Sequence, residues 1–252
     1  MSIYFRDKTW EEIDEAVKRN AVCVLPVGTT EEHGAHLPVG TDALIARAFG
    51  DQLGAACEAK GLPVLLMETI SYGFSMSTVR RWPGCPNIPT RVFMDYIYHI
   101  IDSLITMGFK KIVTLDCHGN HDCLLRTVMR EIADRHNIFI MTLSPSALCA
   151  NTYNAIKKDP EGDIHGGELE TSWILYINRG LVKEDRYTDA DKITCNSILR
   201  GPVSTWGLQE TKTGLYGDPT YASYETGKAC MEAAVAEGVR YVEAFYSLQQ
   251  NG

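Results

Sequence analysis

The most informative stretch of this chain is Pro26-Val-Gly-Thr-Thr-Glu-Glu-His-Gly-Ala-His-Leu-Pro-Val-Gly-Thr-Asp42. Its carboxylates and imidazoles are so crowded that they repel one another or take up protons, unless a positive charge lies among them. A divalent metal ion would turn such a cluster into a set of ligands. The apolar run at 21–27 predicts a strand, so the cluster leaves the carboxyl end of a strand, where open α/β sheets form their ligand sites.

Two further clusters of histidines and carboxylates occur later in the chain. His118-Gly-Asn-His-Asp122 directly follows the apolar run at 111–116, and Asp163-Ile-His-Gly-Gly-Glu-Leu-Glu-Thr-Ser172 precedes a helical pattern. Because the carboxyl ends of parallel strands meet at one edge of a sheet, we expect the three clusters to converge.

Each cluster also has a purely structural explanation when it is taken alone. His118 and Asp122 could cap a helix, and Glu168 and Glu170 could complement the dipole of a helix N-terminus. A coincidence of all three clusters is much harder to accept than any single one.

Strand and helix patterns alternate along the chain. We expect strands at 21–27, 62–68, 111–116 and 138–143, and helices at 9–19, 42–60, 93–107, 122–136, 168–177 and 225–248. Short apolar strands between amphipathic helices predict a mostly parallel sheet covered on both faces. Without any recognisable linker or repeat, residues 1–252 are expected to form one α/β domain, an αβα sandwich.

Composition excludes several classes of function. The net charge of −8 comes without a basic stripe, which argues against nucleic-acid binding. The sequence contains no apolar run near the ~18 residues that a membrane span needs, and its N-terminus lacks a signal-peptide core, so we expect a cytoplasmic protein. Eight cysteines without a Cys-x-x-Cys pair indicate reduced thiols rather than a zinc ribbon or a disulfide scaffold.

The clusters resemble motifs of the creatininase (creatinine amidohydrolase) family. Residues 31–42 resemble its Glu-x-His-Gly-x-His-Leu-Pro-x-x-Thr-Asp signature, His118-Gly-Asn resembles its His-Gly-Gly-Asn element, and 163–172 resemble its Asp-x-His-Ala-Gly-Glu-x-Glu-Thr-Ser segment. The similarity continues through Gly217-Asp-Pro219 toward the C-terminus. It implies a mostly parallel αβα sandwich, a small-molecule substrate and a homo-oligomer, most often a hexamer.

The resemblance also implies two divalent metal ions per subunit, zinc or manganese, with iron as a further option. Glu31 and His118 match ligands of one metal, His33 matches a ligand of the other, and Asp42 matches the carboxylate that bridges both.

One ligand departs from creatininase itself. Creatininase has a metal-binding Glu two residues after its strand-end His, where this chain has Asn120. Creatininase also has an apolar residue where this chain has Glu168. Because the lost and gained carboxylates compensate, we assign Glu168 to the second metal.

The expected chemistry follows from the metals. Two cations about 3.5 Å apart lower the pKa of a shared water so that it can attack a carbonyl carbon. His165 matches the catalytic His of creatininase and is the predicted proton shuttle, with Asp163 orienting it.

The substrate wall is expected in the loop from Tyr72 to Pro86, where this chain differs from creatininase. There Ser75 is a candidate substrate contact, Trp82 could stack on a planar substrate, and Arg80 or Arg81 could bind a carbonyl or an anion. An equal alternative for Arg80 and Arg81 is a subunit contact. His36 could face the substrate or stand behind the metal ligands.

The first hypothesis for function is therefore a dinuclear metal-dependent hydrolase that cleaves a C–N bond in a small cyclic amide. A second is ring opening of a cyclic keto-polyol of the 3-dehydro-scyllo-inosose type, and formamide or peptide hydrolysis is a third. A hypothesis from another class is a non-catalytic metal-binding subunit, against which the complete set of five candidate ligands argues.

Overall fold

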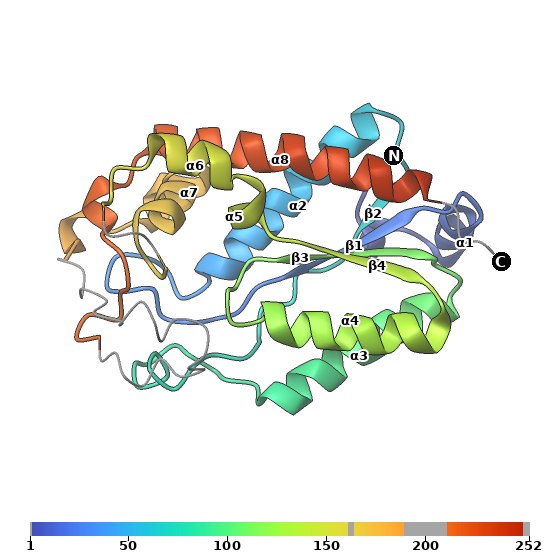
Figure 1. The fold of residues 1–252 in the computed structure, drawn as a ribbon, viewed down its shortest axis with the longest axis horizontal. Coiled ribbons are helices and arrows are strands. Elements are labelled where there is room, and N and C mark those ends of the chain that lie inside the picture. Colours follow the sequence, from blue (N-terminus) through green and yellow to red (C-terminus); the bar gives the residue numbers. More distant parts are fainter. Residues whose placement is uncertain (1, 161–163, 189–210, 249–252) are drawn as a thin grey trace.

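The computed structural model describes residues 2–160, 164–188 and 211–248. Asp163, predicted to orient His165, lies outside these ranges. The four strands β1 (Val22–Val27), β2 (Val64–Leu66), β3 (Lys111–Asp116) and β4 (Phe139–Leu143) form a parallel sheet in the order β2-β1-β3-β4 (Figure 1). The predicted parallel α/β architecture is confirmed.

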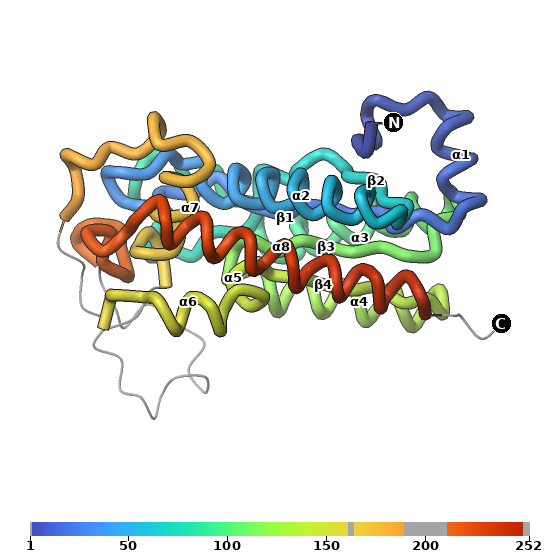
Figure 2. The backbone as a smooth tube through the Cα atoms, turned by 90° about the horizontal axis from the view of Figure 1, so that it is seen from above, coloured from blue at the N-terminus to red at the C-terminus, as the bar shows by residue number. Residues whose placement is uncertain are grey.

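Helices cover both faces of this sheet (Figure 1). One layer contains α3 (Thr90–Thr106) and α4 (Asp122–His136). The other contains α2 (Thr41–Ala59), α5 (Pro145–Leu148), α6 (Ala150–Ile156), α7 (Glu168–Asn178) and α8 (Tyr224–Ser247). In Figure 2, α2 and α8 run side by side above the sheet, in agreement with their tertiary contacts. The result is an αβα sandwich.

Strand β1 shows how the sequence creates the two layers. Successive side chains of a strand point to opposite faces. Val22 and Val24 accordingly pack in the core on the α2 and α8 side, whereas Cys23, Leu25 and Val27 pack in the core on the α3 and α4 side. All six residues of β1 are buried, which explains the continuous apolar run.

The register of β1 and β3 brings the histidine-rich loops together. Val22 pairs with Lys111 at one end and Val27 pairs with Asp116 at the other, so both strands end at the same level. The backbone N–H of Cys117 donates to the carbonyl of Val27 and continues this pairing into the loops. The loops after Val27 and Asp116 therefore start beside each other.

Several local predictions are confirmed and a few are wrong. Helix α1 (Trp10–Lys18) lies within the predicted range 9–19 and begins at a capping box formed by Thr9 and Glu12. Strand β2 spans three residues rather than the predicted seven at 62–68. The short helices α5 and α6 were not predicted, because four and seven residues are too few to show helical periodicity.

The remaining described elements are short 3-10 turns at Phe5–Asp7, Arg179–Leu181, Glu184–Arg186 and Pro219–Tyr221. The described cysteines are all free thiols. In the part of the chain that the structure describes, no helix has the length and apolar character to cross a membrane.

Candidate active site

Asp42 is the centre of a buried cluster at the carboxyl edge of the sheet. It lies in the first turn of α2 and is fully buried. Its Oδ1 lies 3.1 Å from Nε2 of His33, and its Oδ2 lies 2.9 Å from Nδ1 of His118. One carboxylate thus joins imidazoles from two loops, which is the position predicted for a bridging ligand.

Glu31 and His165 complete this side of the cluster. The carboxylate of Glu31 lies 3.7 Å from Nε2 of His118 through Oε2 and 3.7 Å from Nδ1 of His165 through Oε1. The rings of His33 and His165 have centroids 4.3 Å apart. Residues from all three clusters therefore converge as the sequence predicts.

Glu170, rather than Glu168, stands with these residues. Glu170 Oε2 lies 3.8 Å from Nε2 of His33, and ligand atoms of His33, His165 and Glu170 all lie within 4.8 Å of one another. The backbone N–H of Gly166 donates to Glu170 Oε2 and holds the carboxylate in place.

The position of Glu168 contradicts the prediction that it binds the second metal. Its buried carboxylate accepts hydrogen bonds of 2.8–3.1 Å from the backbone N–H groups of Lys158 and Asp159. Two residues along an α-helix correspond to about 200° of rotation, so neighbouring glutamates at this spacing point to opposite sides. Glu168 therefore supports the preceding loop, while Glu170 faces the cluster.

The crowded charges of the cluster shift the pKa values of its members. Burial alone would lower the pKa of His118, but Glu31 and Asp42 raise it to about 9. Burial likewise opposes the charge on His33, yet Asp42 and Glu170 raise its pKa well above the ordinary value. Despite the burial of Asp42, the two imidazoles hold its pKa below the usual range.

Two buried carboxylate oxygens of the cluster indicate that its residues could bind metal ions. Among the described residues, Glu31 Oε2 and Asp42 Oδ2 are buried without a hydrogen-bond donor. Asp42 Oδ2 is within ion-pair distance of His118 but outside hydrogen-bond geometry. Buried oxygens without donors are costly unless a cation pairs with them. Carboxylate oxygens and imidazole nitrogens are also common ligand atoms of zinc and manganese, so the residues fit divalent metals.

The orientation of His165 is set by Glu32. The Nε2 atom of His165 lies 2.7 Å from the carbonyl oxygen of Glu32. A carbonyl only accepts hydrogen bonds, so Nε2 carries the proton and Nδ1 is left bare toward Glu31. The backbone of Glu32 therefore orients His165, whereas the orienting role predicted for Asp163 falls on a residue outside the described ranges. Nothing in the sequence distinguished Glu32 from a spacer, because the contact uses its main chain.

His36 stands behind the cluster rather than in front of it. It is buried, and its Nε2 lies 2.8 Å from Oγ1 of Thr171. Burial, together with His33, lowers its pKa to about 4, so the ring is neutral. Of the two alternatives for His36, the structure favours support of the ligands.

The predicted substrate contacts of the loop after β2 lie apart from the open space of the site. Ser75 is fully buried, and Arg80 is exposed. One face of the Trp82 ring is covered by the guanidinium of Arg81, which lies 4.5 Å from the ring centroid and donates to the carbonyl of Thr211. Arg81 thus ties this loop to the segment before α8.

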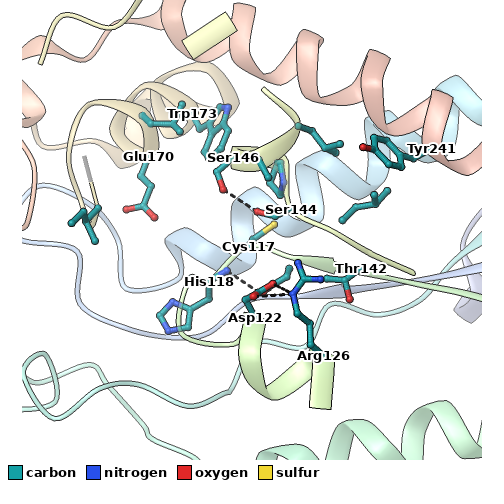
Figure 3. A pocket seen from close by; sticks show the side chains of 18 residues that line it. Cys117, His118, Asp122, Arg126, Thr142, Ser144, Ser146, Glu170, Trp173 and Tyr241 are labelled. Atoms are coloured by element: carbon teal, nitrogen blue, oxygen red, sulfur yellow. Dashed lines mark hydrogen bonds and ion pairs between the residues drawn. The ribbon is translucent and has the colours of Figure 1, made fainter. Parts of the chain in front are cut away.

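The open space is a cavity of about 470 Å³ on another side of the cluster (Figure 3). His118 and Glu170 line it where it meets the cluster, and Trp173 follows on α7. Its described lining contains none of the four predicted substrate contacts. The lining also contains Asp122 of the second cluster, and the residues that the sequence did not single out are chiefly Arg126, Ser144 and Ser146. Ser144 directly follows β4, so the strand-exit rule that found the other clusters could have found it.

His121, like Glu32, had no role assigned from the sequence. Its buried ring stacks on Phe93 at 4.2 Å, and its Nε2 accepts a 3.0 Å hydrogen bond from the backbone N–H of Phe74. The ring also meets that of His118 edge-on at 4.6 Å. His121 therefore joins the ligand loop after β3 to the loop after β2 and to α3.

Comparison with known proteins identifies one family and several relatives that are similar to this chain. A family model described as creatininase, creatinine amidohydrolase, matches residues 6–242. The 3-dehydro-scyllo-inosose hydrolase of Thermotoga maritima is 25% identical over 258 residues, covering 92% of this chain and 79% of that protein. A mycofactocin precursor peptide peptidase of Mycobacterium tuberculosis is 29% identical over 229 residues, covering 87% and 83%.

Solved structures agree with the fold. Creatininase structures described as a manganese form and as a variant of Zn-Zn type each align with a TM-score of 0.82 at 23% identity, covering 98% of this chain and 100% of the other. The family match includes every described member of the cluster, from Glu31 to Glu170. The chain therefore belongs to the creatininase family of metal-dependent hydrolases.

Proposed function

We propose that this protein is an amidohydrolase that uses two divalent metal ions to hydrolyse a C–N bond in a small, cyclic amide. The observation that carries the proposal is the position of Asp42 between His33 and His118, with Glu31 and Glu170 on either side. These five residues are buried or partly buried and offer oxygen and nitrogen donors from three separate loops.

We assign Glu31, Asp42 and His118 to one metal and His33, Asp42 and Glu170 to the other. Bound zinc or manganese would supply a water of lowered pKa and polarise the carbonyl of the substrate. The assignment replaces Glu168 by Glu170 and keeps the other ligands that the sequence predicted.

His165 is the residue that moves the proton. Because its Nε2–H is held by the carbonyl of Glu32, its bare Nδ1 faces the cluster and can accept a proton from the attacking water. The same nitrogen can then donate that proton to the leaving nitrogen of the amide. The fixed ring orientation means that one nitrogen performs both transfers.

A second candidate function is hydrolytic ring opening of a cyclic keto-polyol. It is favoured by the similarity to an inosose hydrolase, which extends over 92% of this chain. The same arrangement serves both reactions, because a ketone carbon and an amide carbon are attacked in the same way. Peptide or formamide hydrolysis is the third option, and the similarity to a peptide peptidase supports its peptide form.

The decisive experiment is an activity screen with metal-replete protein over cyclic amides, formamides, keto-inositols and small peptides, together with metal analysis. We expect metal analysis to find about two metals per chain, and we expect the protein to hydrolyse one of these substrate classes. Asp42→Asn protein is the control and should lose both. Metal-free wild-type protein that retains full activity would refute the proposal.

We further propose that the protein is a cytoplasmic homo-oligomer, a hexamer by resemblance to its family, that acts on a small molecule. The net charge of −8 supports the absence of a nucleic-acid partner. Sedimentation equilibrium of the purified protein tests the assembly, and a monomer at micromolar concentration would contradict it.

A further inference from the structure

The cavity beside the cluster contains two pairs of polar side chains that are already hydrogen-bonded to each other (Figure 3). The hydroxyls of Ser144 and Ser146 lie 2.9 Å apart at the exit of β4. The carboxylate of Asp122 binds Nε of Arg126 with both oxygens, at 2.8 and 2.9 Å, in the first turns of α4. Each pair places a donor next to an acceptor.

This pattern matches the hydrogen bonds that neighbouring hydroxyl groups make. A hydroxyl donates once and accepts through its lone pairs, so a vicinal diol needs donors and acceptors side by side. Nε of Arg126 is used by Asp122, but its terminal nitrogens carry further N–H donors. Ser146 is exposed, and the side chains of Asp122 and Arg126 are 51% and 61% exposed, so a ligand can reach all three.

The charges of the lining disfavour an anionic ligand. Apart from Glu170, which we assign to a metal, the lining contains the carboxylates of Asp116 and Asp122, and Arg126 is the one Lys or Arg in its described part. An anion would require an excess of donors here. A simple lactam, in contrast, offers one N–H and one carbonyl and would use few of these groups.

We propose that Asp122, Arg126, Ser144 and Ser146 form a recognition site for an uncharged, polyhydroxylated substrate, whose reacting carbonyl lies toward His118 and Glu170. The inference rests on the proposed function, since it takes the cluster as the catalytic centre. Among the cyclic amides, keto-polyols, formamides and peptides considered above, the inference favours substrates whose non-reacting part carries hydroxyl groups.

A purely structural explanation of one pair is available, because Asp122 and Arg126 form an exposed pair four residues apart on one helix. Such exposed pairs contribute little to stability. The explanation does not cover Ser144 and Ser146, which lie on a different element and line the same cavity. The two pairs face one space from two sides, and that arrangement is what the proposal uses.

The test is calorimetric titration of manganese-loaded protein with three small-molecule probes. myo-Inositol represents an uncharged cyclic polyol, 2-pyrrolidinone a ring amide without hydroxyls, and succinate an anion. We expect myo-inositol to bind more tightly than the other two. Arg126→Met and Ser146→Ala should each weaken its binding at least fivefold, consistent with the loss of about 1 kcal/mol per hydrogen bond.

Arg130→Met is the matched control, because Arg130 is exposed one turn further along α4 and is absent from the described lining. Its affinity for myo-inositol should equal that of the wild type. Tighter binding of 2-pyrrolidinone or succinate, or unchanged affinity in Arg126→Met, would overturn the inference.

The two proposals fail in different ways. Hydrolysis of a simple lactam without any polyol binding would refute the recognition site and leave the hydrolase intact. Binding of myo-inositol by a protein that hydrolyses none of the screened substrates would refute the hydrolase instead.

Discussion

The Nε2 atom of His165 lies 2.7 Å from the carbonyl oxygen of Glu32, and this contact fixes which ring nitrogen faces the metal ligands. A main-chain oxygen cannot be removed by a side-chain substitution. The Glu32 carboxylate lies further from the same atom, with Oε1 at 3.7 Å. We therefore expect the main-chain contact to persist when residue 32 is changed, so that proton transfer can be tested separately at position 165.

The first prediction concerns His165 itself. His165→Asn should lower kcat by about 10²–10⁴-fold, the usual contribution of a positioned acid–base group. Because we assign no metal to His165, the metal content measured by plasma mass spectrometry should stay at the wild-type value. Loss of a metal together with activity would show that His165 is a ligand rather than a proton shuttle.

The second prediction separates the two glutamates of α7. Glu170→Gln should lose one metal per chain and at least about a hundredfold in activity, because it removes a charged ligand. Glu168→Gln should retain both metals, since its carboxylate binds the backbone of Lys158 and Asp159. It should instead lose about 1–3 kcal/mol of stability, because the amide leaves a buried donor unpaired.

Metal analysis and chemical denaturation of these two variants form one matched experiment. If Glu168→Gln loses the metal and Glu170→Gln keeps it, the ligand assignment must be exchanged.

This pair of residues also shows where sequence reasoning reached its limit. Both glutamates lie in the motif that the sequence singled out, and the choice between them depends on the rotation of α7 about its axis. That rotation is set by packing against α8 and α2, which no local pattern encodes. The convergence of Glu31, His33, Asp42 and His118 was predictable, because strand exits of a parallel sheet meet at one edge. Their assignment as metal ligands rests on the resemblance to the family.

The sequence did not single out the side of the cluster on which the cavity lies, for a related reason. The loop after β2 differs from creatininase and contains Trp82 and Arg80, so it attracted attention as a recognition wall. In the structure the cavity opens instead toward Ser144 and Arg126. Which side of a cluster stays open depends on how side chains fill the other sides, and that is a property of tertiary packing.

The third prediction concerns metal removal and pH. In metal-free protein the pKa of His118 is about 9, above the ordinary value of 6.5. A raised histidine pKa stabilises the fold fully below pH 6.5, and this contribution is lost as the pH rises through about 9. At ~1.4 kcal/mol per pKa unit the loss is on the order of 3 kcal/mol.

Chelator-treated protein should therefore unfold at a lower temperature at pH 9 than at pH 6.5, as measured by circular dichroism. Metal-replete protein should show a smaller change, because metal replaces the protons, and its metal affinity should rise over the same interval. A Tm of the metal-free protein that is unchanged between these pH values would contradict the charge state assigned to His118.

The last prediction uses two glycines near the site as a matched pair. A Cβ added at Gly73 would overlap Cε1 and Nε2 of His121, whereas one added at Gly119 meets no atom within 4 Å. Gly73→Ala should thus push the imidazole off Phe93 and break its hydrogen bond from Phe74, at a cost of about 1–3 kcal/mol. Because the same ring contacts His118 edge-on, we expect Gly73→Ala also to weaken metal affinity.

Gly119→Ala is the control and should change the free energy of unfolding by less than about 1 kcal/mol. Equal stability of the two variants in urea denaturation would show that His121 does not join the two loops.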